Sequence, residues 1–136
     1  MIVLDSSGLI ALVTKRDAHH LEARSIIRAG YGQLVVPAGI MSEVAYLLEH
    51  RGGVRSVDAV LQSIEDGSLR LDCGEQNIPR IRQLVTRYRD MPLGFADASV
   101  IACGERLHAP VLTFDLRHFP VVAREGSFRI AGDDGP

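Results

Sequence analysis

Four carboxylates are the residues of this sequence best placed to do chemistry: Asp5, Glu43, Asp97 and Asp115. Asp97 raises the clearest question because it interrupts an otherwise apolar run, "FADASVIACG". On a helix it would share a face with Val100 and Ile101, the side that turns toward a core. A buried carboxylate is costly unless a partner compensates it, so we expect a cation beside Asp97.

A cluster of such acids has a charge problem with a chemical solution. Carboxylates a few ångströms apart raise one another's pKa values, and a divalent cation removes that conflict. Ligation by oxygen alone, without His or Cys, favours Mg²⁺ or Mn²⁺ over Zn²⁺. Such ions activate water and stabilise charge during in-line displacement at phosphorus. The acids therefore predict metal-dependent phosphodiester hydrolysis, with ligands or a metal-bound water oriented by the neighbouring hydroxyls of Ser6, Ser7 and Thr113.

Short apolar runs alternate with amphipathic segments along the chain. We predict strands at 2–5, 34–37, 69–71, 111–115 and 128–130, and helices at 8–13, 17–29, 38–51, 54–66, 75–89 and 95–107. For the second helix, Asp17 is the expected N-cap and Gly30 the expected residue after the C-cap. Alternation of this kind predicts a three-layer α/β/α sandwich with a central, mainly parallel five-stranded sheet.

These elements would bring the acids together. Asp5 and Asp115 end the first and fourth predicted strands, and parallel strands bind ligands beyond their carboxyl ends, where the strand order reverses. Glu43 lies on the helix after the second strand, where Ile40 and Leu47 share its face, so we expect it to point inward like Asp97. Each acid taken alone has an ordinary interpretation as a cap, a turn residue or a paired buried acid. Together they predict one site.

Composition sets the remaining bounds. The 136 residues carry a net charge of −2 and suit one domain, which we place at 1–131, followed by a frayed tail at 132–136. No signal peptide or membrane span is expected, so we predict a cytoplasmic protein without membrane contact. Cys73 and Cys103 match neither a zinc site nor a disulfide framework. The five histidines show no ligand spacing and are expected to be surface or packing residues: His19, His20, His50, His108 and His118.

Four segments taken together resemble the PIN-domain family, and within it the VapC-type toxins of prokaryotic toxin–antitoxin systems. They are "VLDSSGLIAL", "MSEVAYLL", "LGFADASVIA" and "VLTFDLRHF", and the resemblance runs from residue 2 to about residue 130. It places the acidic quartet of the family on the four acids named above. It implies an endoribonuclease that cuts structured RNA, tRNA or rRNA, and it further implies a homodimer and neutralisation by a cognate antitoxin.

Binding of RNA would have to come from arginine, because the acid site itself is negative. The chain has fourteen arginines and one lysine, Lys15. Planar guanidinium groups suit phosphate oxygens. The candidates are Arg80, Arg87 and Arg117, although each is equally well explained as an ordinary surface residue.

Two other functions remain open from the sequence. A phosphatase or phosphotransfer domain can be built on a similar sheet, but Asp5 is followed by Ser6 and Ser7, and no lysine follows a late strand. A catalytically inactive PIN-like module that binds RNA or protein is disfavoured by the intact set of acids. Metal-dependent cleavage of RNA separates the nuclease from both alternatives.

Overall fold

Four short parallel strands form the centre of the computed structural model, which describes residues 1–132. Across the sheet the order is β3-β2-β1-β4, where β1 is Ile2–Leu4, β2 is Leu34–Pro37, β3 is Leu69–Asp72 and β4 is Val111–Leu112. In the register, Val3 lies beside Val35 on one side and Val111 on the other. The chain order reverses between β1 and β4, so a site is expected at the carboxyl ends of these two strands.

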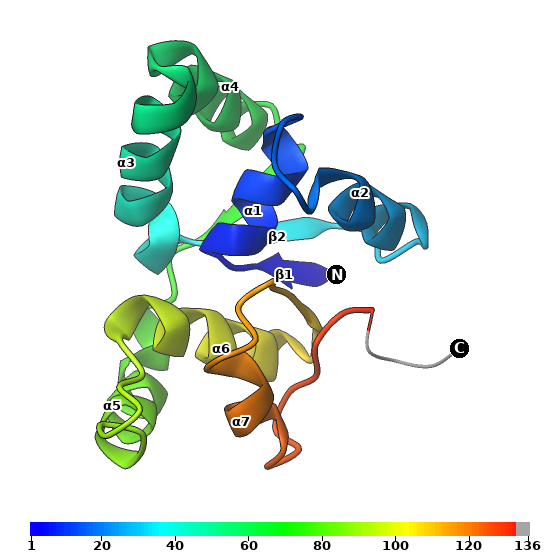
Figure 1. Cartoon of the computed structure of the whole chain (residues 1–136). Helices are drawn as coiled ribbons and strands as arrows, with labels where there is room; N and C mark the ends of the chain where they lie inside the picture. Colours follow the sequence, from blue (N-terminus) through cyan, green and yellow to red (C-terminus); the bar gives the residue numbers. More distant parts are fainter. Residues whose placement is uncertain (133–136) are drawn as a thin grey trace.

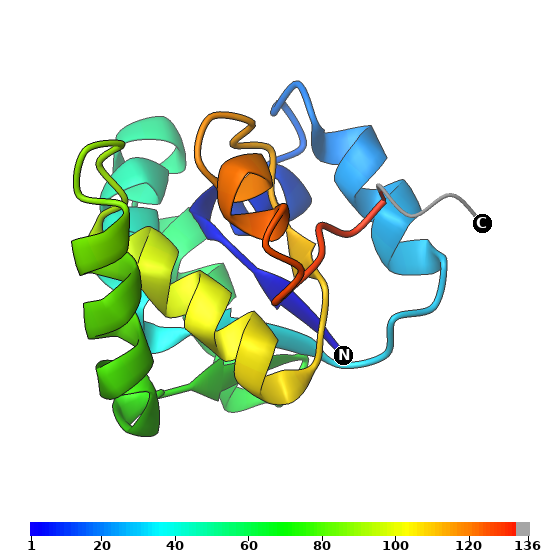
Figure 2. The ribbon, with the colours of Figure 1, turned by 90° about the horizontal axis from the view of Figure 1, so that it is seen from below.

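Helices cover both faces of the sheet (Figure 1). On one face lie α1 (Ser6–Val13), α2 (His20–Arg28), α3 (Met41–Gly52) and α4 (Val54–Glu65), and the 3₁₀ turn η1 (Ala38–Ile40) leads into α3. On the other face lie α5 (Ile78–Arg87), α6 (Phe95–Leu107) and α7 (Phe119–Ala123), with the 3₁₀ turn η2 (Glu75–Asn77) before α5 (Figure 2). The predicted α/β/α class is confirmed.

The apolar run that contains Asp97 forms the helix at the centre of one layer. All residues of α6 from Ala98 to Gly104 are buried, and α6 contacts β1, β2 and β4. The three residues of β1 have no exposed surface, as expected for a parallel strand covered on both faces. Asp97 therefore stands in the first turn of a core helix, at the carboxyl edge of the sheet.

Gly8 allows α1 to approach β4 closely. A Cβ atom at this position would lie 2.3 Å from the carbonyl oxygen of Leu112, so any other residue would force the two elements apart. The N–H of Asp5 donates to the same carbonyl oxygen at 3.2 Å. The start of α1, the end of β1 and the end of β4 are thus held against one another, and the site is built on these three ends.

The prediction of a fifth strand at 128–130 is wrong. Within residues 1–132, the segment 128–130 makes one isolated parallel bridge, between Ile130 and Val111. Two backbone hydrogen bonds hold it, from Val111 N to the Arg129 oxygen at 2.9 Å and from Ala131 N to the Val111 oxygen at 2.8 Å. Because β4 itself has only two residues, it offers too short an edge for a longer ladder.

Other details differ at the ends of elements. The second helix begins at His20 and its N-cap is His19, while Asp17 accepts a hydrogen bond from the His19 N–H at 2.9 Å. Gly30 follows the C-cap with φ of +100°, as expected for that position. Both cysteines are free: Cys103 is buried and Cys73 is exposed. The predicted tail falls, from residue 133 onward, outside the described residues. No described helix has the length and apolar character that crossing a membrane requires.

Candidate active site

Asp5 is the most deeply buried acid of the candidate site. It directly follows β1, caps the N-terminus of α1 and is 4% exposed. Its Oδ1 accepts hydrogen bonds from the Gly8 N–H at 2.7 Å and from the Ser7 hydroxyl at 2.8 Å. Its Oδ2 accepts from the Thr113 hydroxyl at 2.6 Å. Both carboxylate oxygens are therefore fixed in direction by donors from two separate parts of the chain.

The two hydroxyls that hold Asp5 are themselves held by the segment after β4. The N–H of Phe114 donates to Ser7 Oγ at 2.8 Å, and the N–H of Asp115 donates to Thr113 Oγ1 at 3.0 Å. Each relay runs from a backbone N–H through a hydroxyl to the carboxylate of Asp5, so each hydroxyl is oriented as a donor toward Asp5. The predicted orienting role of Ser7 and Thr113 has this geometric basis. Ser6 shares no hydrogen bond with the acids in the described part of the chain.

Burial makes the charge of Asp5 costly. It raises the pKa of Asp5 from 3.8 to about 6, although the hydrogen bonds from Thr113, Gly8 and Ser7 oppose the increase. Repulsion from the Asp97 carboxylate contributes to the increase. A raised pKa with a like-charged neighbour is a feature of sites that operate with a cation, because the cation restores the ionised form.

His118 is the side chain that lies beside Asp97. The Nδ1 atom of His118 lies 3.1 Å from Oδ2 of Asp97 and 3.9 Å from Oδ2 of Asp115. One ligand atom from each of these three residues lies within 4.8 Å of the other two. Figures 1 and 2 both show α7, which His118 precedes, beside α6 on the same face of the sheet. The segment after β4 therefore returns to the first turn of α6.

The prediction that all five histidines are surface or packing residues is wrong for His118. This side chain is 19% exposed and faces the two acids. A tight turn brings it there: Asp115 Oδ1 accepts from the Arg117 N–H at 2.9 Å, which bends the chain so that residues 115 and 118 face each other. The spacing Asp-x-x-His was the available signal in the sequence.

The residues at this edge fit a divalent cation. Asp97 and Asp115 are partly exposed, so each can present an oxygen to an ion that enters from solvent. The carboxylate of Asp5 is oriented by three hydrogen bonds, and burial destabilises its ionised form. An oxygen-rich site with one imidazole at its side is a donor set that Mn²⁺ and related ions accept.

Glu43 does not point inward as predicted. It is exposed in the first turn of α3, whose buried residues are Val44 and Leu48. Ile40, Val44 and Leu48 follow one another at intervals of four residues and are all buried, whereas Tyr46, three residues after Glu43, is 60% exposed. Glu43 therefore shares the outward side of the helix with Tyr46. The structure gathers Asp97 and Asp115 with His118, and Glu43 is not part of that group.

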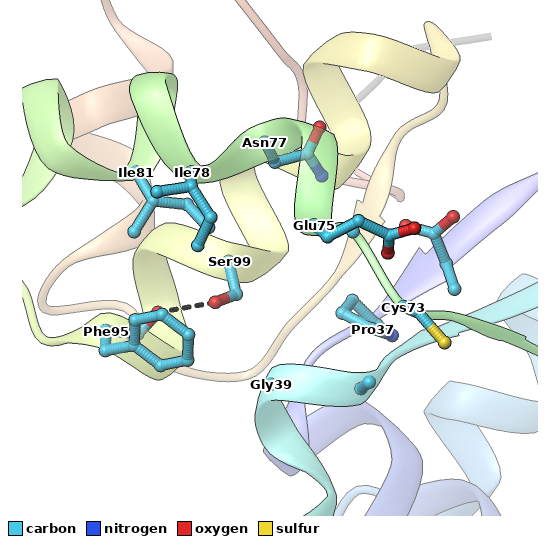
Figure 3. Close-up of a pocket in the computed structure, with 12 residues that line it drawn as sticks. Pro37, Gly39, Cys73, Glu75, Asn77, Ile78, Ile81, Phe95 and Ser99 are labelled. Atoms are coloured by element: carbon cyan, nitrogen blue, oxygen red, sulfur yellow. Dashed lines mark hydrogen bonds between the residues drawn. The ribbon is translucent and has the colours of Figure 1, made fainter.

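Close packing against α6 sets the position of η1 and of the start of α3, which carries Glu43. A Cβ atom on Gly39 of η1 would lie 2.6 Å from Ser99 Oγ, so a glycine allows η1 to pack against α6 (Figure 3). The hydroxyl of Ser99 donates to the Phe95 carbonyl oxygen at 2.8 Å. A pocket lies here, and its lining includes Gly39, Phe95 and Ser99 but none of the four acids. The start of α3 is thus held against the first turn of α6, which carries Asp97.

The three predicted RNA-binding arginines differ in their surroundings. Arg80 makes two hydrogen bonds to the Glu105 carboxylate, at 2.8 and 2.9 Å, which join α5 to α6. Arg87 pairs with Glu125 at 2.6 Å. Arg117 is 84% exposed, and its Nε lies 3.7 Å from Asp115. Of the three, Arg117 lies nearest in the chain to the acid site and is the most exposed.

Comparison with known proteins identifies the family of this chain. The family model that describes the PIN domain matches residues 2–125. Ribonuclease VapC26 of Mycobacterium tuberculosis (strain ATCC 25618 / H37Rv) is 31% identical over 130 residues, which cover 94% of this chain and 96% of that protein.

Solved structures share the fold. VapC20 of Mycobacterium tuberculosis, a toxin that cleaves the sarcin-ricin loop, superposes with a TM-score of 0.78 at 20% identity, over 90% of this chain and 95% of that one. A chain of a toxin–antitoxin complex from Klebsiella pneumoniae gives 0.66 at 18% identity, over 88% and 93%. A chain of VapBC2 from Rickettsia felis, bound to a DNA fragment from its promoter, gives 0.67 at 13% identity, over 96% and 97%. At these identities the likeness concerns the fold alone.

Proposed function

The chain belongs to the PIN domain family and, within it, to the VapC-type ribonucleases, and from that premise we propose that it is a divalent-metal-dependent endoribonuclease of a toxin–antitoxin system. Its substrate is structured RNA, and it acts in the cytoplasm. The observation that carries the proposal is the meeting of Asp5, Asp97 and Asp115 at the point where the strand order reverses.

The exposure of each acid determines how it would contact the metal ion. Asp97 and Asp115, which are partly exposed, would hold the ion, and the buried Asp5 would be the third carboxylate to hold it. Glu43, which is exposed in the first turn of α3, would be the fourth carboxylate of the site. When bound there, Mg²⁺ or Mn²⁺ would supply an activated water and stabilisation of the charge on the phosphate during in-line displacement.

The hydroxyls of Ser7 and Thr113 fix the orientation of the Asp5 carboxylate. Ser7 and Thr113 orient the two oxygens of Asp5, so its carboxylate does not rotate when the ion or the substrate arrives. Ser6, the first residue of α1, is partly exposed, and its hydroxyl would be available to orient a metal-bound water. Ordered supporting partners of this kind raise metal affinity.

Arginine side chains contact the phosphates of the RNA. Arg117 is the main contact, because it follows Asp115 closely and is largely exposed. Arg80 and Arg87 lie on α5 and offer only secondary contacts, because Glu105 and Gln83 engage the guanidinium group of Arg80 and Glu125 engages that of Arg87.

A cognate antitoxin blocks the same site. Two of the structural neighbours are toxin–antitoxin complexes, which supports a protein partner for this chain. The acids attract a cationic side chain of that partner, which would compete with the metal and with RNA. The active form is a homodimer, which sedimentation at micromolar concentration tests.

Expression of the chain without its antitoxin tests the proposal. Wild type should arrest growth of a bacterial host and produce new RNA 5′ ends at a small set of sites, whereas Asp97→Asn should do neither. Asp58→Asn, which removes an exposed carboxylate from α4, is the control and should act like wild type. Unchanged RNA ends after expression of stable wild-type protein would favour the two other functions, phosphotransfer or an inactive binding module.

A further inference from the structure

His118 is held firmly at the acid site. It is the N-cap residue of α7, and the next residue, Phe119, is fully buried and contacts Phe128 edge-on with ring centroids 6.4 Å apart. The imidazole stands at the end of this anchored segment between acids from two other elements, Asp97 of α6 and Asp115 after β4. Its position is therefore fixed by the core.

The distances around His118 suit a shared ion. On an octahedral ion with bonds of about 2.1 Å, adjacent ligand atoms lie about 3.0 Å apart and opposite ones about 4.2 Å apart. The Nδ1 atom lies 3.1 Å from the Asp97 oxygen and 3.9 Å from the Asp115 oxygen, within that span. One N–H can point at only one of the two carboxylates, whereas an ion among the three atoms contacts all of them.

We propose that His118 supplies a nitrogen ligand to the metal ion held by Asp97 and Asp115, and that this ligand makes the site prefer Mn²⁺ to Mg²⁺. The inference rests on the proposed function only in assuming that these acids bind a divalent ion. Imidazole is a softer donor than carboxylate or water, and it binds first-row transition ions far better than it binds Mg²⁺. A ligand set with one nitrogen therefore departs from the all-oxygen site that the sequence alone predicts.

Pulsed electron paramagnetic resonance tests the ligand directly. The protein, labelled with ¹⁵N in histidine, receives one equivalent of Mn²⁺ without RNA. Wild type should show hyperfine coupling to ¹⁵N, and His118→Asn should lose it. The control is His108→Asn at the other end of α6, about 16 Å from Asp97 along the helix axis. Its φ of 51° suits asparagine, so this variant should fold and keep the coupling.

Binding titrations of Mn²⁺ and Mg²⁺ test the preference. Wild type should bind Mn²⁺ more tightly than Mg²⁺, and both His118→Asn and His118→Gln should reduce Mn²⁺ affinity about ten-fold or more while changing Mg²⁺ affinity less. Bound Mn²⁺ without ¹⁵N coupling in wild type, or an unchanged ratio of the two affinities in both variants, would overturn the proposal and leave the proposed function standing. Wild type that binds no Mn²⁺, or binds it equally well after Asp97→Asn, would instead remove the metal site itself.

Discussion

The hydroxyl of Thr113 donates a 2.6 Å hydrogen bond to Oδ2 of Asp5 and links the ends of β4 and β1 across 108 positions of the sequence. The same oxygen of Thr113 accepts from the N–H of Asp115. Two of the acids are thus coupled through one hydroxyl, at the place where the strand order reverses. Loss of the Thr113 hydroxyl should therefore alter both the ionisation of Asp5 and the position of Asp115.

Removal of that hydroxyl should be costly. Thr113→Val keeps the shape of the side chain, but it leaves Asp5 Oδ2 and the Asp115 N–H buried without this partner. We expect a loss of about 1–3 kcal/mol in the free energy of unfolding and a further rise of the Asp5 pKa. Urea denaturation and a ¹³C carboxyl NMR titration measure the two effects. Thr113→Ser retains the donor and should lie close to wild type, and equal losses in both variants would show that the hydroxyl is not responsible.

Metal-free protein should lose stability as the pH rises through the range in which folded Asp5 ionises. The pKa of Asp5 is about 6 in the folded chain and 3.8 as its ordinary value, so between these values the folded state holds a proton that the unfolded state has released. The free energy of unfolding therefore falls from about pH 4 to about pH 6, by roughly 3 kcal/mol from this residue, and then levels off.

The variant Asp5→Asn isolates this contribution. Urea denaturation in EDTA at several pH values should show that Asp5→Asn gains stability relative to wild type as the pH rises from 4 to 6. The comparison cancels other groups, including Glu105, which acts in the opposite direction: burial raises its pKa, but hydrogen bonds from Arg80 and Ser127 outweigh burial and lower the pKa. A difference between the two proteins that is constant with pH would contradict the burial of an ionisable Asp5.

Gly8→Ala should destabilise the fold by forcing α1 away from β4. The added methyl group would meet the carbonyl oxygen of Leu112 at 2.3 Å, and backbone atoms cannot move aside as a flexible side chain can. Overpacking of this kind costs about 1–3 kcal/mol, which urea denaturation measures. Gly94→Ser is the control because its Cβ would meet open space at a helix N-cap. If both variants unfold at the wild-type midpoint, the close approach of the two elements is absent.

The arginines should separate into structural and binding groups. In the Asp97→Asn background, Arg117→Ala should weaken RNA binding and reduce the slope of log affinity against log salt by about 1, without loss of stability. Arg80→Ala should cost about 1 kcal/mol of stability through Glu105 and change RNA affinity less. Fluorescence anisotropy with a labelled hairpin RNA and urea denaturation supply the two readouts. The opposite order of effects would assign the phosphate contact to α5.

Local pattern predicted the elements that bury an apolar run. The strand at 34–37 and the helix at 95–107 have the predicted bounds, because short apolar runs and a nearly all-apolar helix have few alternative structures. The same pattern predicted the strand that precedes Asp5, whereas the strand predicted at 111–115 ends at Leu112, so that Asp115 lies in the segment after β4. These elements account for three of the four acids.

The remaining features depend on geometry that periodicity does not carry. Helix α7 has five residues, fewer than two turns, so no periodic signal marks it, and with it His118 was missed. Glu43 was misoriented because the buried side of α3 runs through Val44 and Leu48, whereas Tyr46, on the side of Glu43, is exposed. Arg80 was assigned to RNA because its partner, Glu105, lies 25 positions away and becomes a neighbour only when α5 packs against α6.

Cleavage of a structured RNA by the purified chain is the most direct measurement of the central claim. With millimolar Mn²⁺, wild type and Asp58→Asn should both cut the RNA within a loop, and EDTA should abolish the reaction. Asp97→Asn and Asp115→Asn should retain the fold by circular dichroism and lose at least about 100-fold in rate, because each removes a carboxylate that holds the ion. Wild-type rates in Asp97→Asn, or cleavage that persists in EDTA, would contradict a metal-dependent nuclease site built on these acids.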